Sequence, residues 1–263
     1  MYQLNQVPSE AQIKKFLRRT LFGVHMFCPV CRSQKVVRYE RRFRCICCRT
    51  KFSLISHTWL KDMKIPIQKF WLILWCWTTQ VPVKQCVALT SISEQGVRHW
   101  FDLFRSHLPE NPSILERIVQ LDEAFFKNTA VMMAKQSGTR NLAYEILHTT
   151  KVSKWHAAYF LEQHVKPKSR LHTDGGGHYR AIEKWWPVHH KTDIHKKWEF
   201  ELTSEIEGVF GNLRTFIRRM YHHTSQEKLP EYVREFCSRF CLPEMFENPR
   251  NYLEKSLSFV PID

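Results

Sequence analysis

The pattern of hydrophobic and polar positions divides the chain into a helical first part and a mixed second part. In the first part, apolar residues recur at helical spacing. We expect helices over residues 8–22 and 66–79, and a helix, turn and helix over residues 83–108. A stretch rich in Cys and Arg, residues 25–55, has a β-like pattern and separates the first two helices.

Strands alternate with helices in the second part, and this alternation predicts an α/β domain. Strands are expected at residues 118–126, 141–152 and 170–173, and helices at residues 155–165, 179–186, 204–220 and 226–241. Residues 111–113 lie beside prolines and are the best candidate for a domain boundary. We therefore expect three parts, residues 1–58, 59–112 and 113–263.

Composition indicates that the chain can form a packed core and which class of partner it attracts. Of the 263 residues, 43% are hydrophobic and 13% aromatic, which is enough for a packed core and excludes bulk disorder. The formal net charge is +15, which favours a polyanionic partner, nucleic acid being the commonest. The alternative is a basic protein whose charge serves only solubility.

The cysteines and the N-terminus indicate a reducing compartment. The nine cysteines are an odd number, and five of them fall within 21 residues. The first 20 residues lack the apolar segment of a signal peptide, and the apolar run Phe70–Trp77 is too short to span a bilayer. We expect no secretion and no membrane partner, hence cytoplasm or nucleoid in a prokaryote and nucleus in a eukaryote.

Four of these cysteines have the spacing of a structural metal site. Cys28-x2-Cys31 is followed after 13 residues by Cys45-x2-Cys48. Two such pairs place four thiolates around a tetrahedral ion, so we expect structural Zn2+ in a zinc ribbon. Cys47 is left out, because its use would distort the second pair. Buried free cysteines are the alternative, but the surrounding stretch is polar.

The predicted zinc ribbon is strongly basic. A small rigid module of this charge is suited to phosphate contacts, although a solvated face is the alternative. The residues expected to contact DNA here are Arg38, Arg41, Arg42 and Arg44. The helix pair within residues 83–108 would add base contacts if it acts as a helix-turn-helix, although many helix pairs merely pack.

Two aspartates stand out in the second part. Asp122 lies within the apolar strand VQLDEAFF, where an acid is costly unless it binds something. Strand alternation places Leu121 and Glu123 on one face and Asp122 on the other. Asp174 follows a short strand and opens the run DGGGH. The alternatives are a solvated acid on an edge strand for Asp122 and an ordinary Asp-Gly turn for Asp174.

A third acid, Glu207, lies on the predicted helix over residues 204–220. It shares a stripe with Arg214 and Arg218, an arrangement suited to a metal beside a phosphate backbone. The alternative is a capping box, Ser204-x-x-Glu207, in which Glu207 serves only the start of the helix. Glu205 is the other candidate on this helix.

The order of the three acids is typical of ribonuclease-H-like nucleases. Asp122 lies on a first strand, Asp174 follows a later strand, and Glu207 lies on a helix after 32 intervening residues. We therefore expect an α/β, ribonuclease-H-like domain behind the zinc ribbon and the helical, helix-turn-helix-like segment.

The sequence resembles the DDE transposases of the Merlin group and their bacterial insertion-sequence relatives, in which a zinc ribbon precedes a ribonuclease-H-like domain. The resemblance covers about residues 10–241 and rests on an ordered set of stretches. These are FCPVCRSQKVVRYERRFRCICCRTKFS, HTWLKDMKIPIQKFWLILWCW, VQLDEAFF, HTDGGGHYRAI and LTSEIEGVFGNLRTFIRRMYHHTSQEKLPEYVREFCSRF. It implies that Asp122, Asp174 and Glu207 are a catalytic triad that holds two divalent ions, Mg2+ or Mn2+.

The chain departs from the family pattern at several positions. Lys127-Asn128 stands near the place of a Gly-Gly pair, and Cys241-Leu242 replaces Asn-Arg. Ser204 stands where Asn is common, and Arg214 where Lys is common. All three acids are retained.

The resemblance implies a transposase that cleaves DNA and transfers strands, with transposon ends and target DNA as partners. Arg214, Arg218 and Arg219 would contact phosphates near the cut, whereas a His pair such as His222 and His223 is more often structural. Because two ends must be held together, we expect a homodimer or a higher oligomer. The alternatives are a non-catalytic zinc-ribbon DNA-binding protein, such as a domesticated transposase or a transcriptional regulator, and a nuclease without strand transfer.

Overall fold

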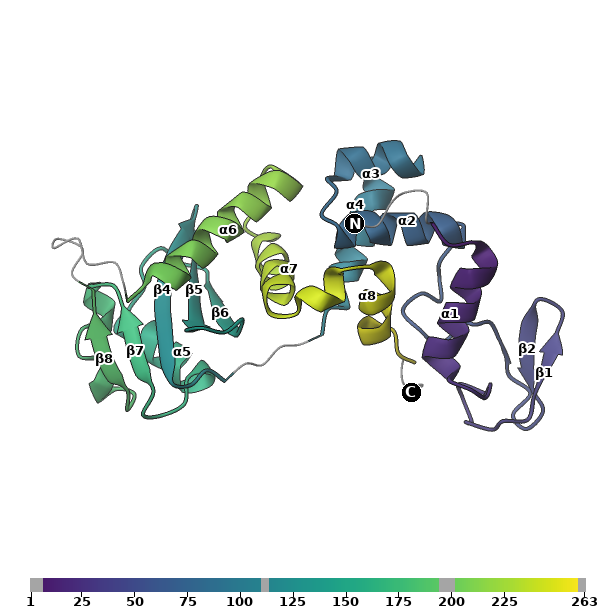
Figure 1. Ribbon diagram of the computed structural model, residues 1–263, viewed down its shortest axis with the longest axis horizontal. Helices are drawn as coiled ribbons and strands as arrows, with labels where there is room; N and C mark the ends of the chain where they lie inside the picture. The colour runs from purple at the N-terminus through teal and green to yellow at the C-terminus, as the bar shows by residue number, and fades with distance from the viewer. Residues whose placement is uncertain (1–6, 110–113, 194–201, 260–263) are drawn as a thin grey trace. The chain divides into compact units, whose positions relative to one another are not determined.

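The computed structural model describes residues 7–109, 114–193 and 202–259, which form two compact units. The first unit combines Met1–His107 with Glu244–Asp263, and the second is Leu108–Pro243. Figure 1 shows the elements of both units. None of the described helices is both long enough and apolar enough to span a bilayer.

The first unit is mainly helical and carries one small antiparallel sheet. The helices expected from the sequence are present, and a further helix, α8, follows near the C-terminus. Its elements are α1 (Glu10–Phe22), β1 (Val36–Tyr39), β2 (Arg42–Cys45), β3 (Lys51–Phe52), α2 (Ile67–Thr78), α3 (Val83–Thr90), α4 (Glu94–Ser106) and α8 (Pro249–Ser256). Ser9 and Gln12 form a capping box at the start of α1, which satisfies backbone N–H groups there.

The C-terminal segment packs into the core of the first unit. The Tyr252 hydroxyl donates to the Phe104 carbonyl (2.9 Å), and Trp59 Nε1 donates to the Ser256 carbonyl (3.1 Å). The Tyr252 ring also lies edge-on to Trp77, with ring centroids 5.1 Å apart. The expected third part, residues 113–263, therefore differs from the structure at this end, because long-range aromatic packing assigns the described residues after Pro243 to the first unit.

The second unit is built on a five-stranded mixed sheet of order β6-β5-β4-β7-β8. The strands are β4 (Ile118–Phe126), β5 (Thr129–Gln136), β6 (Leu142–Leu147), β7 (Arg170–Thr173) and β8 (His189–Thr192). β5 is antiparallel to both β4 and β6, whereas β4, β7 and β8 are parallel. This order and these directions are those of the ribonuclease-H-like fold, so the expected fold class is confirmed.

Two strands of this sheet were not expected from the sequence. β5 is buried at each of its positions, so it lacks the alternation by which a half-buried strand is found. β8 has the sequence HHKT and no apolar residue. The expected helix over residues 179–186 is wrong. Two 3-10 turns, Gly177–Tyr179 and Ile182–Lys184, stand there, separated by Ala181 in a left-handed conformation (φ 56°).

Helices cover both faces of the sheet. The helices of this unit are α5 (Lys154–His164), α6 (Ser204–Tyr221) and α7 (Leu229–Cys241). Phe160 and Leu161 of α5 share a buried cluster with Leu121 of β4. On the opposite face, Gln120 Oε1 accepts the backbone N–H of Ile206 (3.0 Å) and ties the start of α6 to β4. Figure 1 shows α6 along β4 and β5.

Part of the C-terminal signature has a structural role. Glu235 of α7 is fully buried and accepts hydrogen bonds from the Tyr221 hydroxyl (2.6 Å) and from Arg239 Nε (2.9 Å). The rings of Tyr221 and Tyr232 stack with centroids 3.8 Å apart. These contacts join α7 to the end of α6, and a buried charge held in this way is costly to leave unpaired, at about 3–5 kcal/mol.

Candidate active site and metal centre

The sheet register places two of the predicted acids side by side. β4 and β7 are parallel neighbours in which Leu121 is paired with Thr173. The next residue on each chain is an aspartate, Asp122 on β4 and Asp174 just after β7. Because neighbouring strands lie about 4.8 Å apart, the two carboxylates share one end of the sheet.

The third predicted acid, Glu207, lies close enough to influence them. Burial, together with the nearby carboxylates of Glu123, Asp174 and Glu207, raises the pKa of Asp122 from 3.8 to about 7, although a hydrogen bond from the Glu123 backbone opposes the shift. Asp122 lies on the same face of β4 as Gln120, the face covered by α6, because residues two apart on a strand share a face. The structure thus brings together all three acids.

The start of α6 positions Glu207, and it does so without a capping box. The N-cap residue is Thr203 and not Ser204, so Glu207 is not at the position that such a box requires. The Thr203 hydroxyl lies 3.1 Å from both Asp193 Oδ2 and Glu207 Oε1. The backbone N–H of Thr203 also donates to Asp193 Oδ2 (3.0 Å). The buried Asp193, which follows β8, therefore holds the turn that presents Glu207.

The other candidate on this helix, Glu205, has different partners. It forms an ion pair with Lys135 of β5 and accepts the backbone N–H of Gly138 (3.3 Å). These contacts hold the pKa of Glu205 below its usual value, although burial opposes them. The arrangement favours Glu207 as the third acid.

Close packing around Asp174 favours a glycine at position 176. Asp174 Oδ1 accepts the backbone N–H of Gly176 (3.1 Å). A Cβ atom at Gly176 would lie 2.9 Å from both Asp174 Oδ1 and His178 Cε1, closer than real Cβ contacts. Gly176, the middle residue of the glycine run, therefore lets the side chains of Asp174 and His178 lie close to the backbone.

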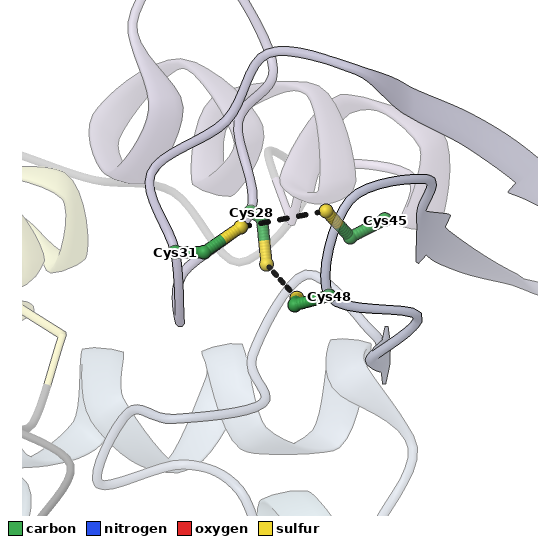
Figure 2. Close-up of side chains that lie close together, drawn as sticks. All are labelled: Cys28, Cys31, Cys45 and Cys48. Atoms are coloured by element: carbon green, nitrogen blue, oxygen red, sulfur yellow. Dashed lines mark hydrogen bonds between the residues drawn. The ribbon is translucent and has the colours of Figure 1, made fainter.

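The four predicted cysteine ligands also lie together (Figure 2). The sulfur atoms of Cys28 and Cys48 lie 3.5 Å apart, as do those of Cys31 and Cys45, and all four are within 4.8 Å of one another. Tetrahedral zinc with Zn–S bonds of about 2.3 Å needs sulfur atoms roughly 3.8 Å apart. A disulfide would need about 2.05 Å. The set fits a tetrahedral metal ion.

The local fold explains how these cysteines meet. Cys45 ends β2 and pairs with Val36 of β1, so the hairpin carries the second cysteine pair back towards the first. Hydrogen bonds with the side chain and backbone of Thr50 lower the pKa of Cys48 to about 6, whereas burial raises the pKa of Cys28. Cys47 is exposed, lies 3.1 Å from the Ser33 hydroxyl and is outside the cluster.

Residues 120–240 match the family model of the ISXO2-like transposase domain. These residues make up most of the second unit, which therefore resembles an ISXO2-like transposase domain. Its resemblance to insertion-sequence transposases, expected from the sequence, is thereby confirmed. No curated protein matches the sequence.

Solved structures similar to the chain include two viral proteins. One is the catalytic core domain of BIV integrase, at 13% identity and a TM-score of 0.32 over 48% of this chain and 82% of that one. Another is a simian T-cell lymphotropic virus intasome in complex with PP2A regulatory subunit B56 gamma, at 11% identity and a TM-score of 0.35 over 64% and 67%. Because both TM-scores lie below 0.5, the fold assignment rests on the strand order of the second unit.

The second unit contains a hydrogen-bonded network that sequence reasoning missed. Glu123 Oε2 accepts hydrogen bonds from the Tyr179 hydroxyl (2.7 Å) and from His178 Nε2 (3.1 Å). Although burial opposes it, these partners hold the pKa of Glu123 below its usual value. The network joins the strand of Asp122 to the loop of Asp174. The sequence signal that could have indicated this network is a polar pair in each acidic motif, Asp122-Glu123 in the first and His178-Tyr179 in the second.

Ligand spacing differs between the two candidate metal sites. Within the described ranges of the chain, the cysteine cluster is the one group of three or more potential ligands whose atoms all lie within 4.8 Å of one another. The carboxylates of Asp122, Asp174 and Glu207 are therefore more widely spaced than the four thiols. Two ions about 3.5–4 Å apart need a wider set of ligands than one ion does.

The predicted DNA-contacting arginines occupy two places. Arg38, Arg41 and Arg42 are exposed and line a hollow of about 610 Å3 together with Lys14 and Arg18 of α1. Half-buried Arg44 lies over the Tyr39 ring, 6.0 Å from its centroid. Arg214, Arg218 and Arg219 are exposed on α6 of the second unit.

Proposed function

We propose that this protein catalyses metal-dependent DNA cleavage and strand transfer, with Asp122, Asp174 and Glu207 as its catalytic triad. The observation that carries the proposal is the sheet register, in which Asp122 and Asp174 follow the paired residues Leu121 and Thr173. The Glu207 charge contributes to the raised pKa of Asp122, which supports Glu207 as the third residue of the triad. The transposase family match supports the class of reaction.

The three carboxylates would hold two Mg2+ or Mn2+ ions. When bound, such ions activate a water or a 3′-hydroxyl and stabilise the oxygen that leaves phosphorus. Asp122, with a pKa of about 7, loses its proton when it becomes a ligand. The hydrogen bonds of Glu123 with His178 and Tyr179 keep the two aspartate-bearing segments in register. Asp193 and Thr203 orient Glu207.

The first unit would recognise DNA. We assign structural Zn2+ to Cys28, Cys31, Cys45 and Cys48, and DNA contacts to Arg38, Arg41, Arg42 and Arg44 of the ribbon. Lys14 and Arg18 of α1 extend this basic surface. The helices α3 and α4 would add contacts to the element ends, and Arg214, Arg218 and Arg219 would contact phosphates near the cut. A homodimer or higher oligomer would hold two ends.

The test is a plasmid assay with the purified protein and DNA that carries the inverted repeats flanking its gene. With Mg2+, we expect nicks at the repeat ends and joined products, and with Ca2+ neither. DNA binding without any cleavage would overturn the catalytic proposal in favour of a regulator. Cleavage without joining would overturn strand transfer in favour of a nuclease.

The raised pKa of Asp122 predicts a stability effect in the absence of divalent ions. A carboxyl group whose folded pKa of about 7 exceeds its unfolded value of 3.8 binds more protons when folded, so stability falls as pH rises between these values. Asp122→Asn removes this cost. We expect the variant to be more stable than wild type at pH 8, by roughly 2–4 kcal/mol, and nearly equal to it at pH 4.

Urea unfolding in magnesium-free buffer measures this difference. A chelator is avoided because it would also attack the cysteine site. Asp62→Asn, at an exposed aspartate, is the control and should have little effect at either pH. A stability gain for Asp122→Asn that is the same at pH 4 and pH 8 would contradict the assignment of a buried, high-pKa carboxyl.

A further inference from the structure

A second hollow, of about 310 Å3, lies in the second unit at the end of α6 distant from Glu207. Its lining comes from the turn between β4 and β5, the second half of α6, and the segment before α7. The residues that matter are Phe126, Lys127, Arg214, Arg218, His222 and His223. Gln226 Nε2 donates to the Thr129 hydroxyl (3.1 Å) and ties that segment to β5.

The charge of this hollow suits an anion. Lys127, Arg214 and Arg218 line it, two imidazoles add donors, and its lining includes no carboxylate. Within the part of the chain that the structure describes, none of the three cations forms an ion pair. Unpaired cations gathered around a concave surface are the usual arrangement for holding phosphate.

The backbone at this hollow is strained at two of its residues. Lys127 has a φ of 54° and His222 a φ of 59°. A non-glycine residue in this region costs roughly 1–2 kcal/mol, and such strain clusters at functional sites. Glycine would adopt this conformation without that cost. The chain therefore tolerates strain where it gains a cation.

Two elements lead from the acids to this hollow. Along α6, Arg214 and Arg218 follow Glu207 by seven and eleven residues, about 10 and 17 Å at 1.5 Å per residue. Along β4, Phe126 follows Asp122 by four residues, about 13 Å at 3.3 Å per residue. At about 3.4 Å per stacked nucleotide, these lengths correspond to roughly three to five nucleotides.

We propose that this hollow binds the phosphate backbone of the reacting DNA strand, about three to five nucleotides from the phosphate at the acids. The inference rests on the proposed function and adds a subsite to it. Lys127, Arg214 and Arg218 neutralise the backbone there, and the imidazoles of His222 and His223 donate hydrogen bonds. The subsite holds the strand in line with the catalytic acids.

The first experiment measures binding of a 5′-fluorescein-labelled, 20-nucleotide single strand by anisotropy in Ca2+ buffer at several salt concentrations. Lys127→Gly keeps the left-handed backbone and removes the cation. We expect this variant to bind about 3- to 10-fold more weakly. The slope of log affinity against log salt concentration should be smaller in magnitude by about 0.7. Lys168→Gly is the matched control, because Lys168 is also exposed and left-handed (φ 66°) but precedes β7 at the other end of the sheet.

The second experiment locates the contact. Single methylphosphonate linkages remove one phosphate charge at a time, counted from the 3′ end of the oligonucleotide. Wild type should lose affinity mainly when the linkage is about the third to the fifth, and Lys127→Gly should not respond there.

The subsite proposal would be overturned if Lys127→Gly and Lys168→Gly lost the same amount of DNA affinity. It would also be overturned if Lys127→Gly responded to each methylphosphonate position as wild type does. If wild type still cleaves DNA in that case, the proposed function stands. The expected linkage profile without any Mg2+-dependent cleavage would instead support the subsite and overturn the catalytic function.

Discussion

Replacing Asp122 or Asp174 by asparagine is expected to abolish Mg2+-dependent cleavage and strand transfer while DNA binding persists. An amide cannot supply the negative charge that a divalent ion requires. Loss of a residue that merely orients a metal ligand costs about 10- to 100-fold, so loss of a ligand itself should exceed about 100-fold. The plasmid assay measures both products, and anisotropy measures binding. Because Asp122→Asn should be at least as stable as wild type, its inactivity would not be explained by unfolding.

The first turn of α6 offers a matched pair of controls. Glu207→Gln should lose both reactions, whereas Glu205→Gln, whose carboxylate pairs with Lys135, should keep them. Both substitutions change one carboxylate to an amide, two residues apart on one helix. Retained strand transfer in Glu207→Gln, or its loss only in Glu205→Gln, would refute the assignment of Glu207.

Loss of one ribbon cysteine is expected to have the second large effect. Cys28→Ser should release the zinc ion, unfold the segment around β1–β3 and abolish specific binding to element ends. Structural zinc contributes on the order of 10–16 kcal/mol to the folding of small zinc modules, and this segment has only a three-stranded sheet of its own. The second unit should remain folded, because its buried cluster lies within its own residues.

Metal analysis of the purified reduced protein checks this prediction, with one zinc per chain in wild type and none in Cys28→Ser. Cys47→Ser is the control, since Cys47 lies outside the cluster, and it should keep both zinc and DNA binding. Wild-type protein without zinc, or full end binding by Cys28→Ser, would rule out the proposed role of the ribbon.

The sequence predicted the cysteine cluster better than it predicted the acids. The two Cys-x2-Cys pairs constrain the geometry locally, and one hairpin brings them together. Each acid had a plausible local alternative when considered alone. The capping-box alternative for Glu207 is wrong because α6 begins one residue earlier, at the N-cap Thr203, a boundary that depends on the buried carboxylate of Asp193.

Several features had no sufficient local signal. β5 is buried throughout and has no alternation, so its antiparallel place between β4 and β6 was not expected. The described residues after Pro243 have an ordinary helical sequence, and it is long-range contacts, such as that of Tyr252 with Phe104, that show to which unit they belong. The network of Glu123, His178 and Tyr179 joins residues more than 50 positions apart.

The sequence by itself determined the kinds of chemistry available: four thiols at metal spacing, three acids in the order of a ribonuclease-H-like nuclease, and a large excess of basic residues. These depend on residue type and short-range spacing. Only the tertiary structure decided which groups meet. The parallel register of Leu121 with Thr173 sets Asp122 beside Asp174, and the side chain of Gln120 brings α6 over them. Register and helix docking depend on contacts between distant segments, which local patterns do not encode.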